Sequence, residues 1–222
     1  MRRRLPPYYP LVAAWVLASS IGVAVSGALA GRLAASGEDV AITFAPTVAD
    51  GIRQYGPATT AAMATWGAGL GAMQWIVVRG RLEGGAWWAP TTAAGWGVAG
   101  AVIGSLVGAL NGRLSAGAHD AGLIGVVITV SLSLLALGLI PATFQWLILR
   151  RSTRSWTWYS LRHLAGLVAG GLALWALASS LGLNLPSGPA WAVGGIAMGT
   201  SIGVATARPV AQSLTPARDS GF

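Results

Sequence analysis

The chain has 222 residues, of which 54% are hydrophobic and only 9% are charged. Typical globular chains carry about 25% charged residues, so this composition excludes an ordinary soluble domain and predicts an integral membrane protein. The net charge of +8 comes from 14 arginines. Because these arginines stand at the ends of apolar runs, the charge does not indicate a nucleic-acid partner. The absence of cysteine excludes disulfides and thiolate metal sites.

Six apolar runs follow one another along the chain, and each is long enough to cross a bilayer. They cover approximately residues 11–30, 57–78, 90–110, 120–149, 160–181 and 190–207. The first run follows three arginines and a tyrosine pair, the order expected at a cytoplasmic membrane face. A signal peptide cleaved after Ala30 is the rival interpretation. The run is longer than an h-region of about 7–15 residues, so we expect a retained helix.

The longest polar stretch, residues 31–56, is expected to be an extracytoplasmic loop. Within it, residues 46–56 are expected to form a short interfacial helix that ends at Gly56. This loop carries enough mixed chemistry to be a recognition surface.

Two prolines affect the helices expected from the fourth and sixth runs. The fourth run is about 45 Å long as a helix, against a hydrocarbon core of about 30 Å, so a kink at Pro141 or a tilt is expected. Pro209, which follows Arg208, is expected to stop the sixth helix and leave residues 209–222 as a short cytoplasmic tail.

The arginines predict the orientation of the bundle. Eleven of them fall on the side of the two termini, and only Arg32, Arg53 and Arg113 fall on the other side. The positive-inside rule therefore predicts that both termini are cytoplasmic. The fold expected is an all-α, single-domain membrane bundle of six transmembrane helices. Its three hairpin repeats are approximately residues 11–79, 90–150 and 160–208.

The repeat is visible as a motif at two helix ends. The stretch from Gln74 to Arg79 reads QWIVVR, and the stretch from Gln145 to Arg150 reads QWLILR. The same offset of 71 positions aligns Trp87 with Trp158. Residues 15–22 also echo residues 175–182, with a shift along the helix.

These two stretches, each followed by an aromatic pair and a glycine-rich helix, resemble a loosely defined set of uncharacterised bacterial multi-span membrane proteins with a repeated QWxxLR-like motif at helix ends. The resemblance covers about the middle half of the chain. It implies a helical bundle in the bacterial cytoplasmic membrane, and it implies no activity, ligand or catalytic residue.

Trp75 with Arg79, and Trp146 with Arg150, are spaced four apart and share a helix face. We expect both pairs to be membrane anchors with the tryptophan at the headgroup boundary. Gln74 and Gln145, one residue earlier, face the bundle if the tryptophans face lipid. Two interpretations remain open for these glutamines: they pin helices together, which we favour, or they line a ligand site.

Glycines recur every four residues in the third and sixth runs and predict close helix packing. These are Gly100, Gly104, Gly108, Gly195, Gly199 and Gly203. A flat pigment, such as a chlorin or carotenoid, is the alternative use of such a stripe.

The chain shows no pattern of catalytic or metal-ligating residues. His119 and His163 fall on opposite sides of the membrane, where each is expected to be an interfacial polar residue, and no acidic residue lies inside a span. We therefore expect a non-enzymatic membrane protein, a structural or accessory subunit that associates with other membrane subunits or with itself. The alternative is a protein that binds or translocates a neutral or hydrophobic solute, a lipid or a pigment. No cofactor is expected beyond such a lipid or pigment.

Overall fold

The computed structural model describes residues 8–35, 47–115, 122–150, 155–181 and 188–214, which are helical with no strand among them. Six α-helices and one 3-10 turn make up these residues. The helices are α1 (Tyr8–Ala35), α2 (Val48–Val78), α3 (Trp88–Ser115), α4 (Gly122–Leu149), α5 (Trp156–Leu181) and α6 (Gly188–Leu214), and the turn η1 (Gly85–Trp87) precedes α3. Four of the helices, α1 to α4, are long and apolar enough to cross a membrane.

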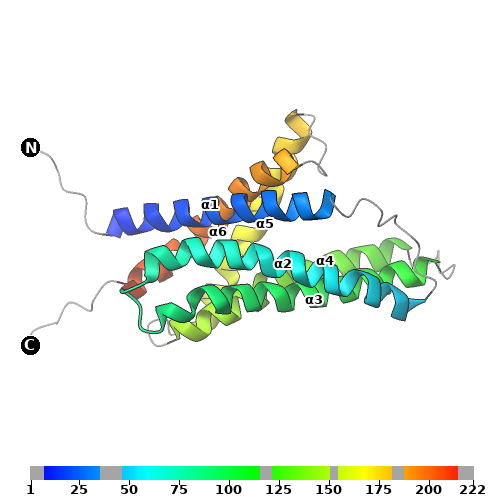
Figure 1. Ribbon diagram of the computed structural model, residues 1–222, viewed down its shortest axis with the longest axis horizontal. Coiled ribbons are helices and arrows are strands. Elements are labelled where there is room, and N and C mark those ends of the chain that lie inside the picture. Colours follow the sequence, from blue (N-terminus) through cyan, green and yellow to red (C-terminus); the bar gives the residue numbers. More distant parts are fainter. Residues whose placement is uncertain (1–7, 36–46, 116–121, 151–154, 182–187, 215–222) are drawn as a thin grey trace, which may run out of the picture.

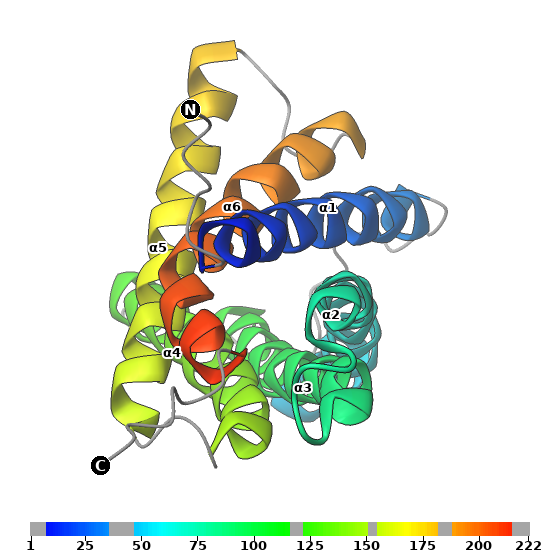
Figure 2. The same cartoon turned by 90° about the vertical axis from the view of Figure 1, so that its left-hand side faces the viewer.

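The helices alternate in direction and form a closed ring. The start of α1, the ends of α2, α4 and α6, and the starts of α3 and α5 lie at one end of the bundle (Figure 1). Each helix packs against its neighbours in sequence, and α1 also packs against α6 (Figure 2). The ring order is therefore the chain order, and every described helix presents one face to a shared interior.

Helix α2 begins at Val48, so the expectation that residues 46–56 form a separate helix ended by Gly56 is wrong. Pro57 lies inside α2, and Thr47 caps the helix by accepting a hydrogen bond from the backbone N–H of Asp50 at 3.2 Å. The extra turns pack on α3, where a Cβ at Gly112 would lie 2.6 Å from the Cα of Val48. Tertiary packing thus overrides the local Gly-Pro signal.

The loop expected over residues 31–56 is correspondingly shorter. Helix α1 continues to Ala35 and α2 begins at Val48. The remaining part of that loop, residues 36–46, lies outside the described residues. Helix α3 also runs past its expected end, to Ser115, and Asn111 donates a hydrogen bond to the Tyr55 hydroxyl at 3.0 Å.

Helix α6 continues through Pro209 to Leu214, so the expected stop at Arg208 and Pro209 is wrong. Val210 and Leu214 are buried in the same cluster as Trp15, and burying these side chains offsets the hydrogen bond that proline cannot donate. The cytoplasmic tail expected over residues 209–222 is therefore helical as far as Leu214, and the rest lies outside the described residues. Helix α4 is continuous through Pro141, and the kink or tilt expected there stays a prediction.

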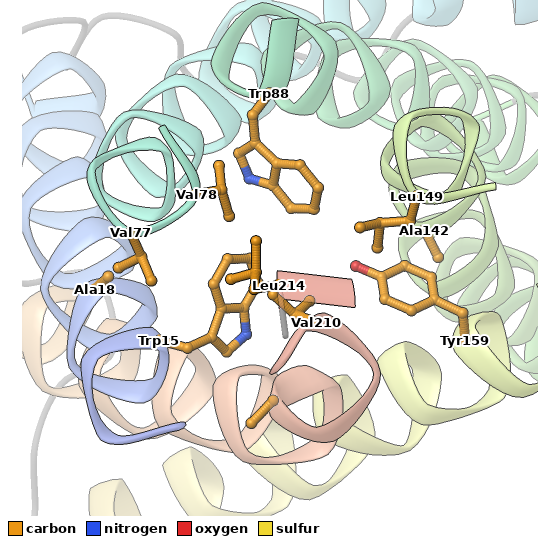
Figure 3. Close-up of a cluster of buried hydrophobic side chains, with 11 residues drawn as sticks. Trp15, Ala18, Val77, Val78, Trp88, Ala142, Leu149, Tyr159, Val210 and Leu214 are labelled. Carbon is orange, nitrogen blue, oxygen red and sulfur yellow. The ribbon is translucent and has the colours of Figure 1, made fainter. Parts of the chain in front are cut away.

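Two buried apolar clusters fill the interior of the ring. The first lies toward the end of the bundle where α1 begins, and it surrounds Trp15, Trp88 and Tyr159 (Figure 3). The second lies further along the same helices and includes Trp66, Trp96 and Leu167. Polar side chains are inserted among these two clusters, and they make up the candidate site.

Candidate functional site: a buried polar core

Gln74 and Gln145 meet inside the bundle. Each side chain is 1% exposed, and the amide nitrogen Nε2 of Gln145 donates to the Gln74 carbonyl Oε1 at 3.3 Å. The two copies of the repeated motif therefore contribute their glutamines to a single interior hydrogen bond. Interhelical bonds of this kind between spans average about 0.6 kcal/mol.

Each glutamine carbonyl also accepts a hydrogen bond from an aromatic residue 14 positions later. The Trp88 indole Nε1 donates to Oε1 of Gln74 at 3.1 Å, and the Tyr159 hydroxyl donates to Oε1 of Gln145 at 2.8 Å. Trp88 and Tyr159 are fully buried, and Figure 3 shows both rings pointing into the centre of the helix ring. Each donor lies near the start of the helix that follows its glutamine.

Each glutamine amide in turn donates to a hydroxyl on the preceding helix. Nε2 of Gln74 donates to Ser19 on α1 at 2.9 Å, and Nε2 of Gln145 donates to Thr92 on α3 at 3.3 Å. Both lone pairs of the Gln74 carbonyl and both N–H groups of the Gln145 amide thus have protein partners. The hydrogen-bond partners of both glutamine side chains are therefore other side chains of this bundle.

A related bond closes the ring between α1 and α6. The Trp15 indole Nε1 donates to the Thr206 hydroxyl at 3.0 Å, and Thr206 donates to the Ile202 carbonyl at 2.7 Å. Trp15 also meets Trp88 edge to face, with ring centroids 5.5 Å apart and planes at 76°. This geometry is favoured between aromatic rings.

Every described helix therefore supplies a buried polar side chain near this end of the bundle. We call these six residues the polar core: Ser19, Gln74, Thr92, Gln145, His163 and Thr206. On α1, α3 and α5 the core residue lies four positions after Trp15, Trp88 or Tyr159, so both residues face the interior.

His163 is fully buried, so the expectation that it is interfacial is wrong. It lies one helical turn after Tyr159 and shares the inward face of α5. Neither ring nitrogen has a hydrogen-bond partner among the described residues. His119 lies outside the described residues.

The arginines of the expected anchor pairs are exposed at helix ends. The guanidinium carbon of Arg79 is 5.2 Å from the centroid of the Trp75 ring. In the second pair Arg150 is exposed and Trp146 is partly buried. A third pair of the same spacing, Trp158 with Arg162, has a distance of 5.6 Å and was not anticipated from the sequence.

The glycines of the third helix lie against the backbone of α2. A Cβ on Gly104 would lie 2.8 Å from both the Cα of Gly56 and the carbonyl oxygen of Tyr55, and one on Gly100 would lie 2.6 Å from the Thr59 carbonyl. Gly108 faces Gly51 still more closely. No side chain fits at these positions without moving a helix.

The glycines of the sixth helix lie against α1. Gly195 faces Val23 and Ala24, Gly199 faces the backbone of residues 19 and 20, and Gly203 faces Val16. A Cβ on Gly195 would lie 2.7 Å from the Val23 carbonyl oxygen. Protein backbone occupies the space beside both glycine stripes, which is the arrangement that close helix packing requires.

Six residues of the polar core and its aromatic donors were not anticipated from the sequence, although a signal for them was present. The offset of 71 that relates the two glutamines also relates Trp88 to Tyr159 and Thr92 to His163. The fifth and sixth, Trp15 and Ser19, stand 73 positions before Trp88 and Thr92. In the structure Trp15 occupies the role of Trp88, whereas the sequence comparison had aligned it with residue 175.

The chain matches no protein-family model, no curated protein and no solved structure. The chemistry of the polar core therefore has to be argued from its own geometry.

Proposed function

We propose that the chain is a non-enzymatic protein of the bacterial cytoplasmic membrane that serves as a structural or accessory subunit of a larger membrane complex. In this proposal all six helices cross the bilayer as three hairpins, and both termini are cytoplasmic. The observation that carries the proposal is the bonding of Gln74 and Gln145, whose polar groups are used by Ser19, Thr92 and aromatic donors of the bundle. Such a core stabilises helix packing.

The hairpin arrangement is supported by the recurrence of the same bonds. In the first two hairpins a glutamine near the end of the second helix donates to a hydroxyl on the first helix. In the third hairpin Thr206 takes the place of the glutamine and accepts from Trp15. A degenerate terminal copy is common in repeat architectures.

The first half of α4 is the surface we propose for a partner subunit. No residue of α4 before Ala136 is buried, and Leu123, Ile124 and Val127 are 79%, 66% and 56% exposed. Because successive residues are about 100° apart, exposed side chains from Val126 to Ile128 cover most of the helix circumference. A span with so little contact to its own bundle is suited to pack against helices of another subunit or copy.

Native mass spectrometry after gentle purification in lipid nanodiscs tests this proposal. We expect a second membrane polypeptide, or a second copy, at fixed stoichiometry, and we expect Val127→Trp to remove it. Val25→Trp is the matched control, because Val25 is 62% exposed on α1. A monomer that carries only a stoichiometric small solute would contradict the subunit proposal.

One observation favours the alternative, binding of a lipid or pigment chain. An apolar groove of about 500 Å³ lies along the outer surface of α3 and α4, lined by Trp87, Pro90, Phe144 and Leu147 among others. Its lining fits an acyl or isoprenoid chain. Ala94→Trp, within the groove, is expected to displace such a molecule from the nanodisc preparation, and an unchanged lipid and pigment content would remove this alternative.

A further inference from the structure

Four side chains have buried polar atoms that find no partner among the described residues: Ser133, a half-buried residue of α4, and three residues of the interior. The three interior residues are His163, at both ring nitrogens, Trp96, at the indole Nε1, and Ser160, at the hydroxyl. All three interior residues are at most 1% exposed. Buried polar groups in native proteins are nearly always hydrogen-bonded, to protein or to ordered water.

The rings of Trp96 and His163 lie close to one another, and His163 itself belongs to the polar core. Trp96 lies one turn after Thr92 on α3, and His163 lies one turn after Tyr159 on α5. Their ring centroids are 6.3 Å apart with planes at 53°. Ser160 lies three residues before His163, on the same side of α5.

The arrangement of the polar core shows what His163 lacks. Ser19 on α1 and Thr92 on α3 each receive an N–H from a glutamine amide on the following helix. His163 occupies the corresponding place on α5, but α6 provides Thr206, whose hydroxyl proton goes to the Ile202 carbonyl. The donor that serves the other two helices is missing at the third.

We propose that a buried water molecule bound by His163, Trp96 and Ser160 takes the place of the missing amide. A neutral imidazole offers one donor and one acceptor, the indole N–H is a donor only, and the serine hydroxyl is either. Water makes about three hydrogen bonds in protein interiors, so one molecule can bond the indole N–H, the serine hydroxyl and whichever imidazole nitrogen faces it, as donor or as acceptor. Two nitrogens bridged by one water lie roughly 5–6 Å apart, which rings with centroids 6.3 Å apart allow.

A halide ion fits the same donors less well. A halide only accepts hydrogen bonds, so it can bond the indole, the hydroxyl and an imidazole N–H, but it cannot donate to an imidazole acceptor nitrogen as water can. It also buries a charge, which is costly without a paired cation. The nearest basic residue in sequence, Arg162, has its guanidinium carbon 5.6 Å from the centroid of the Trp158 ring. Water is therefore the occupant that the chemistry selects, independently of whether the chain is an accessory subunit.

Solid-state NMR of the full chain in bilayers tests the proposal, with labelled histidine and tryptophan nitrogens. The chain has two histidines, so His119→Gln leaves His163 as the only one. We expect magnetisation transfer from water protons to one His163 ring nitrogen and to one indole nitrogen, and the indole signal should be absent from Trp96→Phe. Trp66→Phe, whose ring lies 6.4 Å from that of Trp96, is the control and should leave the transfer to His163 intact.

Two results would overturn the proposal. One is a folded protein in which the His163 nitrogens receive no magnetisation from water. The other is a shift of the His163 and Trp96 signals when chloride is exchanged for bromide, which would assign the position to a halide.

Unfolding measurements give a second, independent test. His163→Gln keeps one donor and one acceptor group at this position for the water, so we expect an unchanged unfolding midpoint and a retained water signal at Trp96. His163→Leu is expected to lower the midpoint, because it leaves the water and Trp96 short of partners. If the position is dry, His163→Leu removes two unpaired nitrogens and raises the midpoint instead, which contradicts the proposal.

Discussion

At the scale of single residues, the polar core shows how one glutamine side chain connects several helices by hydrogen bonds. Gln145 bonds to three other side chains, from α2, α3 and α5. A buried amide whose N–H or C=O groups lack hydrogen-bond partners destabilises a fold. An amide with partners on several helices favours one arrangement of those helices over others. The bonds are individually weak, and their value is in the number of helices that one side chain connects.

The bond from Tyr159 to Gln145 gives a direct test at this scale. Tyr159→Phe removes the donor and leaves the ring, and we expect a loss of roughly 0.6–1.7 kcal/mol in the free energy of unfolding. A double-mutant cycle with Gln145→Leu, measured by equilibrium unfolding in mixed micelles, isolates the coupling between the two side chains. Additive effects of the two substitutions would mean that this hydrogen bond does not stabilise the bundle.

At the scale of helices, the glycine stripes decide where helices end as well as how closely they approach. Helix α2 extends to Val48 because the glycines of α3 let its backbone lie against these extra turns. The same helix pair shows why Gly56 does not stop α2. The Cα of Gly56 lies against Gly104 on α3, and it is Gly104 whose missing side chain permits this contact, since a Cβ at Gly56 would meet nothing within 4 Å.

Gly104→Leu tests this packing. We expect a loss of at least about 1–3 kcal/mol in the free energy of unfolding, because a Cβ there meets the α2 backbone at 2.8 Å and overpacking costs that much. Gly171→Leu on α5 is the matched control, since a Cβ at Gly171 meets nothing within 4 Å. Both substitutions gain the same helix propensity, so equal midpoints for the two variants in mixed micelles would remove the packing claim.

The comparison between sequence and structure also belongs to this scale. Six apolar runs predicted six helices, and the placement of Gln74 one residue before an anchoring tryptophan predicted that it faces the bundle. The helix ends predicted near Gly56 and Pro209 were wrong, because tertiary contacts there outweigh the local helix-breaking signals. The partners of the glutamines were not predictable, because they depend on which helices become neighbours in the ring.

At the scale of the whole molecule, the ends of the bundle differ in charge. Arg79, Arg81, Arg150 and Arg208 lie near the end where α1 begins and α6 ends, and Arg53 and Arg113 lie toward the opposite end. The positive-inside rule therefore predicts that the first end faces the cytoplasm.

Because the chain has no cysteine, single-cysteine labelling tests this orientation without background. We expect a membrane-impermeant maleimide to label Thr47→Cys in intact cells. Ser155→Cys, at the opposite end of the bundle, should react only after the membrane is permeabilised. The reverse pattern would invert the proposed topology.

The arginines of the α4–α5 connection are expected to contribute to that orientation. Arg150→Glu combined with Arg151→Glu should shift labelling of Ser155→Cys toward the outside in a fraction of molecules, since it removes two positive charges beside a span. Gln212→Glu, an exposed substitution near the end of α6, serves as a control for added negative charge. Unchanged labelling would show that other arginines determine the topology.

The two halves of helix α4 are held by the bundle to different degrees. Its second half is packed into the interior through Ala142, Gln145 and Leu149, whereas its first half, residues 122–135, has no buried residue. A change in bilayer thickness should therefore shift residues 122–135, while the buried second half of α4 keeps its position. Spin-label distances from Thr47→Cys to Leu123→Cys should then differ between thin and thick bilayers, and distances from Ser155→Cys to Leu147→Cys should not.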